Sequence, residues 1–114
     1  MLEADLIRIR HMIDACGQAI EFIQNKSKSD LETDKLLQFA VIRAIEIIGE
    51  AASRVTTETR IQHPEIPWIV IVGMRNRLIH AYFDINTVIL WQALTHEIPP
   101  LLVKLEGTIA QSEE

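Results

Sequence analysis

Apolar residues recur at steps of three, four and seven along most of the 114-residue chain, which is the spacing of one face of an α-helix. Signs of β-structure are nearly absent, because the sequence has no Asn-Gly or Asp-Gly turn and no sustained alternation of apolar and polar residues. The apolar faces of the first two predicted helices consist of Leu2, Leu6, Ile9, Ile13, Ile20 and Ile23, and of Leu37, Val41, Ile45, Ile48, Ala52 and Val55. The sequence therefore predicts an all-α fold.

Polar residues and prolines divide the periodic pattern. Ser29 and Glu32 predict a capping box at the start of the second helix, with Ser29 as the cap and Glu32 reaching back. Pro64 and Pro67 predict a break before a third helix at about residues 68–82.

The fourth helix is expected to follow caps at residues 84–87 and to kink or split at Pro99 and Pro100. A polar tail at about residues 109–114 is expected to fray. The length suits a single domain, residues 1–114, folded as an antiparallel four-helix bundle.

The composition is typical of a cytoplasmic globular protein. No apolar stretch is long enough to span a bilayer, and the acidic residues near the N-terminus do not fit a signal peptide. A single cysteine, Cys16, cannot form an internal disulfide and suits a reducing compartment. We therefore expect a cytoplasmic protein with no membrane association.

Charge is unevenly distributed along the sequence. The net charge of −5 argues against general nucleic-acid binding, because phosphate affinity comes mainly from Lys and Arg. Residues 66–83, however, contain no Asp or Glu but include Arg75, Arg77 and His80. This window can present a local anion site on an acidic molecule.

The side chains in this window suit the cleavage of RNA. RNA carries its own nucleophile, the 2′-hydroxyl, so cleavage needs proton transfer and stabilisation of added negative charge on phosphorus. His80 is suited to the proton transfer, and Arg75 to the charge. The four histidines and one cysteine have no metal-ligand spacing, so neither a metal nor another cofactor is expected.

Helix geometry constrains how these residues combine. If the third helix reaches residue 82, Asn76 shares a face with His80, whereas Arg75 and His80 differ by about 140°. Arg75 and Tyr82 are seven residues apart and nearly eclipsed. A site built from two copies of the helix solves the divergence, so a homodimer is expected.

Several residues have two readings. Asn76 could orient the imidazole of His80 or bind phosphate, or it could simply be a polar residue exposed to solvent. Arg77 could make an auxiliary phosphate contact or a surface salt bridge. Glu46 and Glu50 fit an ion-pair ladder with Arg43 and Arg54 of the same helix. The two glutamates could instead hold the active arginine of a facing helix.

The arrangement Arg75-X4-His80-X-Tyr82 resembles the motif of the HEPN ribonuclease toxins of the HepT type. Residues 43–51 resemble the second-helix signature of this family, and residues 66–68 and 73–76 resemble its lead-in to the motif. Residues 82–85 and 88–91 also fit, and the resemblance covers about residues 3–106.

The resemblance implies a HEPN-like helical bundle that dimerises, with metal-independent endoribonuclease activity in the cytoplasm and transfer RNA as a possible substrate. Arg75 and His80 would be essential, with Asn76 and Arg77 near the phosphate. It further implies the toxin of a type VII-like toxin–antitoxin system. The antitoxin would be a nucleotidyltransferase of the MntA type that transfers AMP onto Tyr82 and so places a bulky anion at the site.

A second hypothesis is a non-catalytic helical scaffold that partners a nucleotidyltransferase. Its arginines would hold nucleotide or RNA without cleaving it. The sequence leaves both hypotheses open.

Overall fold

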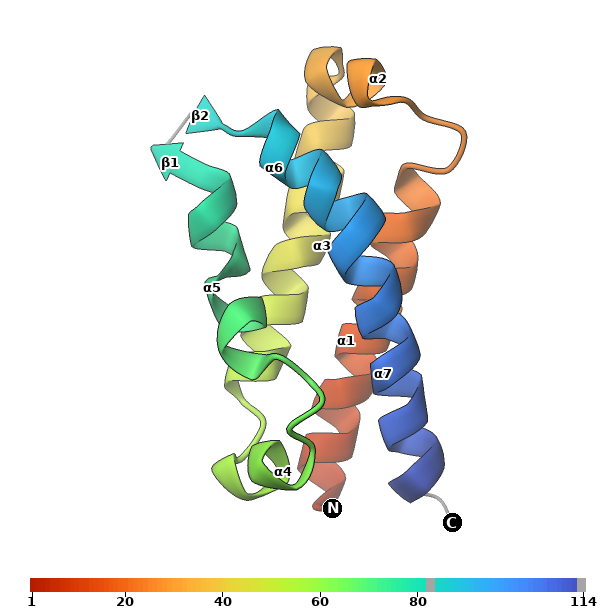
Figure 1. Ribbon diagram of the computed structural model, residues 1–114, viewed down its shortest axis with the longest axis vertical. Coiled ribbons are helices and arrows are strands. Elements are labelled where there is room, and N and C mark those ends of the chain that lie inside the picture. Colours follow the sequence, from red (N-terminus) through yellow and green to blue (C-terminus); the bar gives the residue numbers. More distant parts are fainter. Residues whose placement is uncertain (82–83, 113–114) are drawn as a thin grey trace.

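The computed structural model describes residues 1–81 and 84–112, and its four long helical segments alternate in direction (Figure 1). They are α1 (Glu3–Phe22), α3 (Lys35–Ser53), α5 (Trp68–Leu78), and a last rod made of α6 (Thr87–Gln92), a π-helical turn η1 (Ala93–Glu97) and α7 (Ile98–Ser112). The short helices α2 (Lys28–Thr33) and α4 (Thr57–Gln62) connect the rods at opposite ends of the bundle. The predicted all-α four-helix bundle is confirmed.

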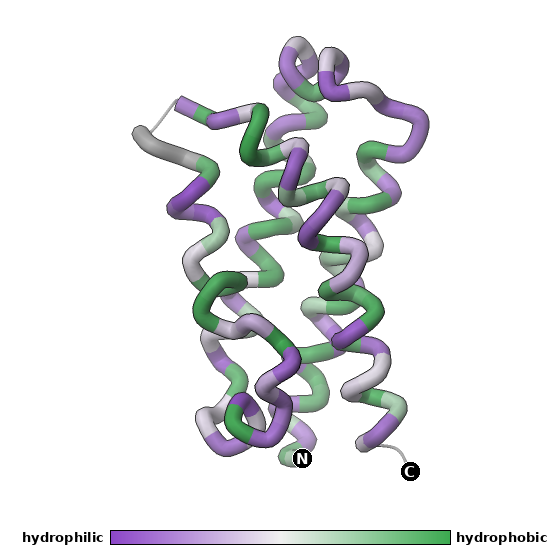
Figure 2. Tube along the Cα trace, viewed as in Figure 1, coloured by the Kyte–Doolittle hydropathy of each residue, from purple (hydrophilic) through white to green (hydrophobic). Residues whose placement is uncertain are grey.

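The core lies where α1 packs on α3 and on the last rod and where α5 packs on α3, and Figure 2 shows the apolar positions along these segments. Ile9, Ile45 and Ile48, all predicted core positions, are fully or almost fully buried. Leu2 lies outside the core, with 57% of its surface exposed, because it precedes the first turn of α1. No helix within residues 1–81 and 84–112 is long and apolar enough to cross a membrane.

The capping box lies two residues earlier than predicted. Ser27, not Ser29, caps α2: its hydroxyl accepts a bond from the amide of Asp30, whose carboxylate accepts a bond from the amide of Ser27. The error arose because both serines stand three residues before an acidic residue, so the pattern alone fits either position.

The second predicted helix is divided at Asp34. The backbone of Asp34 is extended, and its side chain accepts a hydrogen bond from the amide of Leu37 at 3.1 Å, which starts α3 as a new helix. No proline or glycine stands near Asp34, and for this reason the sequence pattern did not reveal the break.

A buried carboxylate joins α4 to α1. Asp5 is 1% exposed and accepts hydrogen bonds from the amide of Thr56 at 3.0 Å, the hydroxyl of Thr56 at 2.6 Å and the hydroxyl of Thr59 at 2.6 Å. Burial alone would raise the pKa of Asp5, but the bonds from Thr56 and Thr59 outweigh it and the pKa is lowered. Asp5 therefore holds the start of α4 against the N-terminal helix.

The last rod is interrupted, as predicted, but on the N-terminal side of the prolines. Pro99 and Pro100 lie in the first turn of α7, where a missing amide proton costs least. Their rings conflict with the carbonyls of Thr95 and His96, four residues back, and η1 widens the helix there. The rod is helical through Ser112, and residues 113–114 of the predicted frayed tail lie outside the described residues.

Candidate functional site

The third helix ends at Leu78, so the predicted continuation to residue 82 is wrong. Strand β1 (Ile79–Ala81) follows and pairs antiparallel with β2 (Asp84–Ile85). The carbonyl of Leu78 accepts a hydrogen bond from the amide of Asn86 at 2.9 Å. Because Asn86 also caps α6, as predicted for residues 84–87, one residue ends α5 and starts the next helix.

Because α5 ends at Leu78, Asn76 and His80 do not lie on one helix. His80 lies in β1, so it does not share a helix face with Asn76, and the angle of about 140° that we derived for Arg75 and His80 does not apply. The backbone of His80 is described but its side chain is not, and Tyr82 lies wholly outside the described residues. The roles of His80 and Tyr82 remain predictions.

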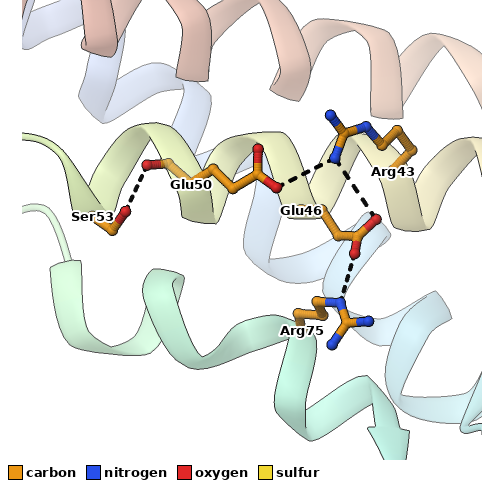
Figure 3. A network of polar contacts seen from close by, with 5 residues as sticks. All are labelled: Arg43, Glu46, Glu50, Ser53 and Arg75. Atoms are coloured by element: carbon orange, nitrogen blue, oxygen red, sulfur yellow. Dashed lines mark hydrogen bonds and ion pairs between the residues drawn. The ribbon is translucent and has the colours of Figure 1, made fainter. Parts of the chain in front are cut away.

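Arg75 contacts α3 through a short ion pair. Its Nε donates a hydrogen bond to Oε2 of Glu46 at 2.6 Å, from the last turn of α5 to the middle of α3 (Figure 3). Half of the Arg75 side chain is exposed, against a quarter of the Glu46 side chain. Among the described residues, the two Nη groups of Arg75 have no hydrogen-bond partner, so they are available to an anion.

A ladder of ion pairs on α3 supports Glu46. Nη1 of Arg43 lies 4.0 Å from Oε1 of Glu46 and 3.3 Å from Oε1 of Glu50 (Figure 3). The ladder predicted for Arg43 is therefore confirmed, and so is the alternative in which a glutamate holds an arginine of the facing helix. Glu46 does both, because each of its two oxygens faces a different arginine.

A pocket of about 110 Å³ lies between α3 and α5 beside this ion pair. It is lined by Ile45, Glu46, Gly49, Glu50, Ile71, Val72 and Arg75. At Gly49 the helices are close: a Cβ there would lie 3.5 Å from the carbonyl oxygen of Ile71, an ordinary contact distance. Gly49 is thus not required for packing, but its missing side chain leaves the pocket open.

Arg77 and Asn76 take up different positions from Arg75. Nη2 of Arg77 lies 3.5 Å from Oε1 of Glu97 in η1, so the surface salt-bridge reading of Arg77 is the one that the geometry shows. Exposed pairs of this kind contribute about 0–1 kcal/mol, which leaves Arg77 free to exchange partners. Asn76 is exposed.

The outer face of α5 is apolar and uncovered. Ile69 is 87% exposed, Val70 47% and Val72 41%, while Trp68, Ile71, Met74 and Leu78 point into the bundle. One helix therefore carries an apolar outer face along its first two turns and exposed cations in its last turn. Such a patch is typical of a protein–protein interface.

A metal site and the thiol of Cys16 are the other candidate chemical centres. Within the described residues, no group of three or more His, Cys, Asp or Glu side chains is placed to hold a metal ion. Burial raises the pKa of Cys16 to about 12, so this thiol stays protonated and packs as an apolar side chain.

Comparison with known proteins identifies the class to which this helical bundle belongs. The model of the family "Ribonuclease HepT-like" matches residues 12–107. A protein of Thermococcus cleftensis named "Probable ribonuclease HepT" is 42% identical, over 82% of this chain and 89% of its own length. The chain belongs to the HepT-like ribonuclease family, as the motif at residues 75–82 predicted.

Further relatives agree. A protein of Caldanaerobacter subterraneus subsp. tengcongensis named as a "Putative RNase" is 40% identical, over 82% of this chain and 83% of its own length. One of Methanocaldococcus jannaschii, also named as a "Putative RNase", is 35% identical over 83% and 87%. No solved structure matches the chain at a significant level.

Proposed function

We propose that this protein is a metal-independent endoribonuclease that acts as the toxin of a toxin–antitoxin system. The observation that carries the proposal is the 2.6 Å bond from Glu46, which fixes Arg75 at the exposed end of α5 with its Nη groups unpaired. His80 follows five residues later, in β1. Because the chain belongs to the HepT-like ribonuclease family, we expect the phosphate bound there to belong to RNA.

The reaction uses the substrate's own nucleophile. The 2′-hydroxyl loses its proton and forms a bond to phosphorus, the bond from phosphorus to the 5′-oxygen breaks, and that oxygen gains a proton. His80 performs a proton transfer, since an imidazole titrates near neutral pH. Arg75 stabilises the extra negative charge on the phosphoryl oxygens through two parallel donors.

Glu46 positions Arg75 for this task. By accepting a hydrogen bond from Nε, Glu46 restricts the guanidinium to one orientation and leaves the Nη pair facing away from α3 (Figure 3). Arg43 shares the charge of Glu46, so the glutamate holds Arg75 without fully neutralising the site.

We propose that the active form is a homodimer paired through the outer face of α5. Isologous pairing would cover Ile69, Val70 and Val72 and bring the cationic ends of two α5 helices together. Arg75 of one protomer and His80 of the other would then act on one phosphate.

Regulation by a nucleotidyltransferase antitoxin of the MntA type is proposed from the family resemblance. Transfer of AMP to Tyr82 would place a bulky anion two residues from His80 and block the site by size and charge. An unmodified Tyr82 in protein neutralised by its antitoxin would instead indicate direct occlusion.

Expression in cells separates a toxin from a non-catalytic scaffold. Wild-type protein without antitoxin should arrest growth, whereas the variants Arg75→Ala and His80→Ala should not. His96→Ala, which removes an exposed histidine of η1, serves as the matched control and should remain toxic. Normal growth with abundant folded wild-type protein would favour the scaffold and contradict the proposal.

A further inference from the structure

A second pocket lies on the other side of α3 from the first. It has a volume of about 90 Å³ and is lined by Arg8, His11, Ile47, Glu50, Ala51 and Arg54. Arg8 and His11 come from α1, and Arg54 follows the last residue of α3. Two guanidinium groups and an imidazole thus converge on one small hollow of an acidic protein.

The acidic residue of this pocket is bound elsewhere. The carboxylate of Glu50 extends along α3 toward Arg43, with Oε1 3.3 Å from Nη1 of Arg43 (Figure 3). Within residues 1–81 and 84–112, the side chains of Arg8, His11 and Arg54 form no ion pair or hydrogen bond. The basic side chains of the pocket therefore remain without a counter-charge.

Arg54 is not needed to finish α3. The carbonyls at the C-terminal end of that helix are satisfied by Arg60, which donates to Ala52 at 2.7 Å and to Val55 at 3.1 Å. Arg60 also lies over the ring of Trp68, which fixes it in that role. The guanidinium of Arg54 is therefore available to bind a ligand.

We propose that Arg8, His11 and Arg54 bind a backbone phosphate of the RNA that the neighbouring site cuts. Two arginines that line one pocket without an ion-pair partner repel each other unless an anion lies between them, and arginine forks match phosphate oxygens. This assignment rests on the proposed function, because it is the RNA held at Arg75 that supplies the second phosphate.

The position of the pocket suits one continuous strand. Both pockets are bordered by Glu50, so they lie on either side of the same ridge of α3. Glu46 and Arg54 are eight residues apart, which corresponds to about 12 Å along the helix. Phosphates in one strand of a duplex are spaced about 3.4 Å along the axis, so a few nucleotides span the distance.

The test is binding and cleavage by the double variant Arg8→Gln/Arg54→Gln. In a His80→Ala background, its Kd for a single-stranded RNA should rise about tenfold at low salt, with a dependence on salt shallower by about 1.4 log units per decade. Cleavage of long RNA should fall about tenfold in kcat/KM. Cleavage of a dinucleotide, too short to reach the pocket, should be unchanged.

Matched variants make the result decisive. Lys26→Gln/Lys104→Gln removes the same charge from exposed positions on other elements and should leave the Kd within about twofold. Arg8→Lys/Arg54→Lys should restore most of the affinity. Thermal unfolding and the oligomeric state of each variant show whether the fold is kept.

Two outcomes would overturn the proposal. One is an unchanged Kd and salt dependence in the folded double variant. The other is unchanged RNA binding together with loss of the homodimer, which would assign the cations to a carboxylate of a second copy. Because binding is measured in the His80→Ala background, failure of the wild-type protein to cleave RNA would disprove the proposed function without producing either outcome.

Discussion

Nε of Arg75 lies 2.6 Å from Oε2 of Glu46, so the cationic end of α5 is fixed to the middle of α3 by a single charge-assisted hydrogen bond. The bond joins residues 29 positions apart in the chain. The hydrogen bond determines how the Arg75 side chain is oriented, whereas an exposed arginine at a helix end is otherwise free to rotate. The effect of this bond on RNA cleavage can be tested with variants that keep the fold.

Removal of Glu46 should impair the chemical step more than RNA binding. Without the carboxylate the Arg75 fork samples many orientations, so Glu46→Ala should lower kcat about tenfold or more and leave KM within about threefold. Glu46→Gln keeps an acceptor oxygen and should restore part of kcat. Single-turnover cleavage measures the two effects.

The control for Glu46 is Glu106→Ala on α7, an exposed glutamate that lines neither pocket, which should keep wild-type rates. An equal loss of kcat in Glu106→Ala, or a Glu46→Ala protein with unchanged kcat, would show that Glu46 does not position Arg75.

Charge on the outer face of α5 should separate the protomers. Ile69 is 87% exposed in one chain, so Ile69→Asp costs little within a protomer but places a carboxylate in the proposed interface. Light scattering should show a monomer, with RNA cleavage lost in parallel. Val103→Asp, at a 69% exposed position of α7, should remain dimeric and active.

Mixing variants tests whether the site is shared. If Arg75 and His80 come from different protomers, refolding Arg75→Ala together with His80→Ala gives mixed dimers with one intact site and about half of the wild-type activity per mixed dimer. If both residues act within one chain, the mixture stays inactive.

Asp5 should make stability depend on acid pH. Its pKa is lowered in the folded protein, so its contribution is present above the ordinary carboxyl pKa of about 3.9 and is lost as pH falls through the lower folded value. Asp5→Asn should lose about 2 kcal/mol at pH 7, since it removes a charged acceptor from three donors. The variant should also lack the part of the acid transition that Asp5 causes.

Denaturant titrations at pH 7 and pH 3, with the exposed Glu106→Gln as control, measure the contribution of Asp5. A loss of stability in Asp5→Asn that is equal at both pH values would show that the charge of Asp5 does not stabilise the link between α1 and α4.

Gly49 should tolerate alanine but not a long side chain. A methyl group would make ordinary contact with Ile71 and Val72, and alanine favours a helix over glycine by about 1 kcal/mol, so Gly49→Ala should raise the melting temperature slightly. Gly49→Leu should fill the pocket beside Arg75 and reduce cleavage. An unaffected cleavage rate in a folded Gly49→Leu protein would exclude the pocket from the site.

The helical bundle was predictable because the apolar spacing repeats over whole helices, so every turn of a helix places an apolar residue on the same face. Positions such as Ile45 and Ile48 are accordingly buried as predicted. The boundaries were less predictable, because a cap depends on which of two equivalent serines adopts an extended backbone. The break at Asp34 is of the same kind.

The contact between Arg75 and Glu46 was predictable from the sequence, whereas the geometry around it was not. The sequence identified Arg75 and offered Glu46 as a possible partner, and the structure brings the two together. The end of α5 at Leu78 depends on a bond from Asn86, eight residues away, which no helical period reveals. The pocket of Arg8, His11 and Arg54 was missed because its residues are far apart in sequence and meet only through packing of α1 on α3.

The most direct measurement is cleavage of RNA by purified protein in the presence of EDTA. We predict that the wild-type protein cuts RNA at an undiminished rate, and that Arg75→Ala and His80→Ala are each slower by about a hundredfold or more. Cleavage that stops with EDTA, or that persists at the wild-type rate in His80→Ala, would contradict the account.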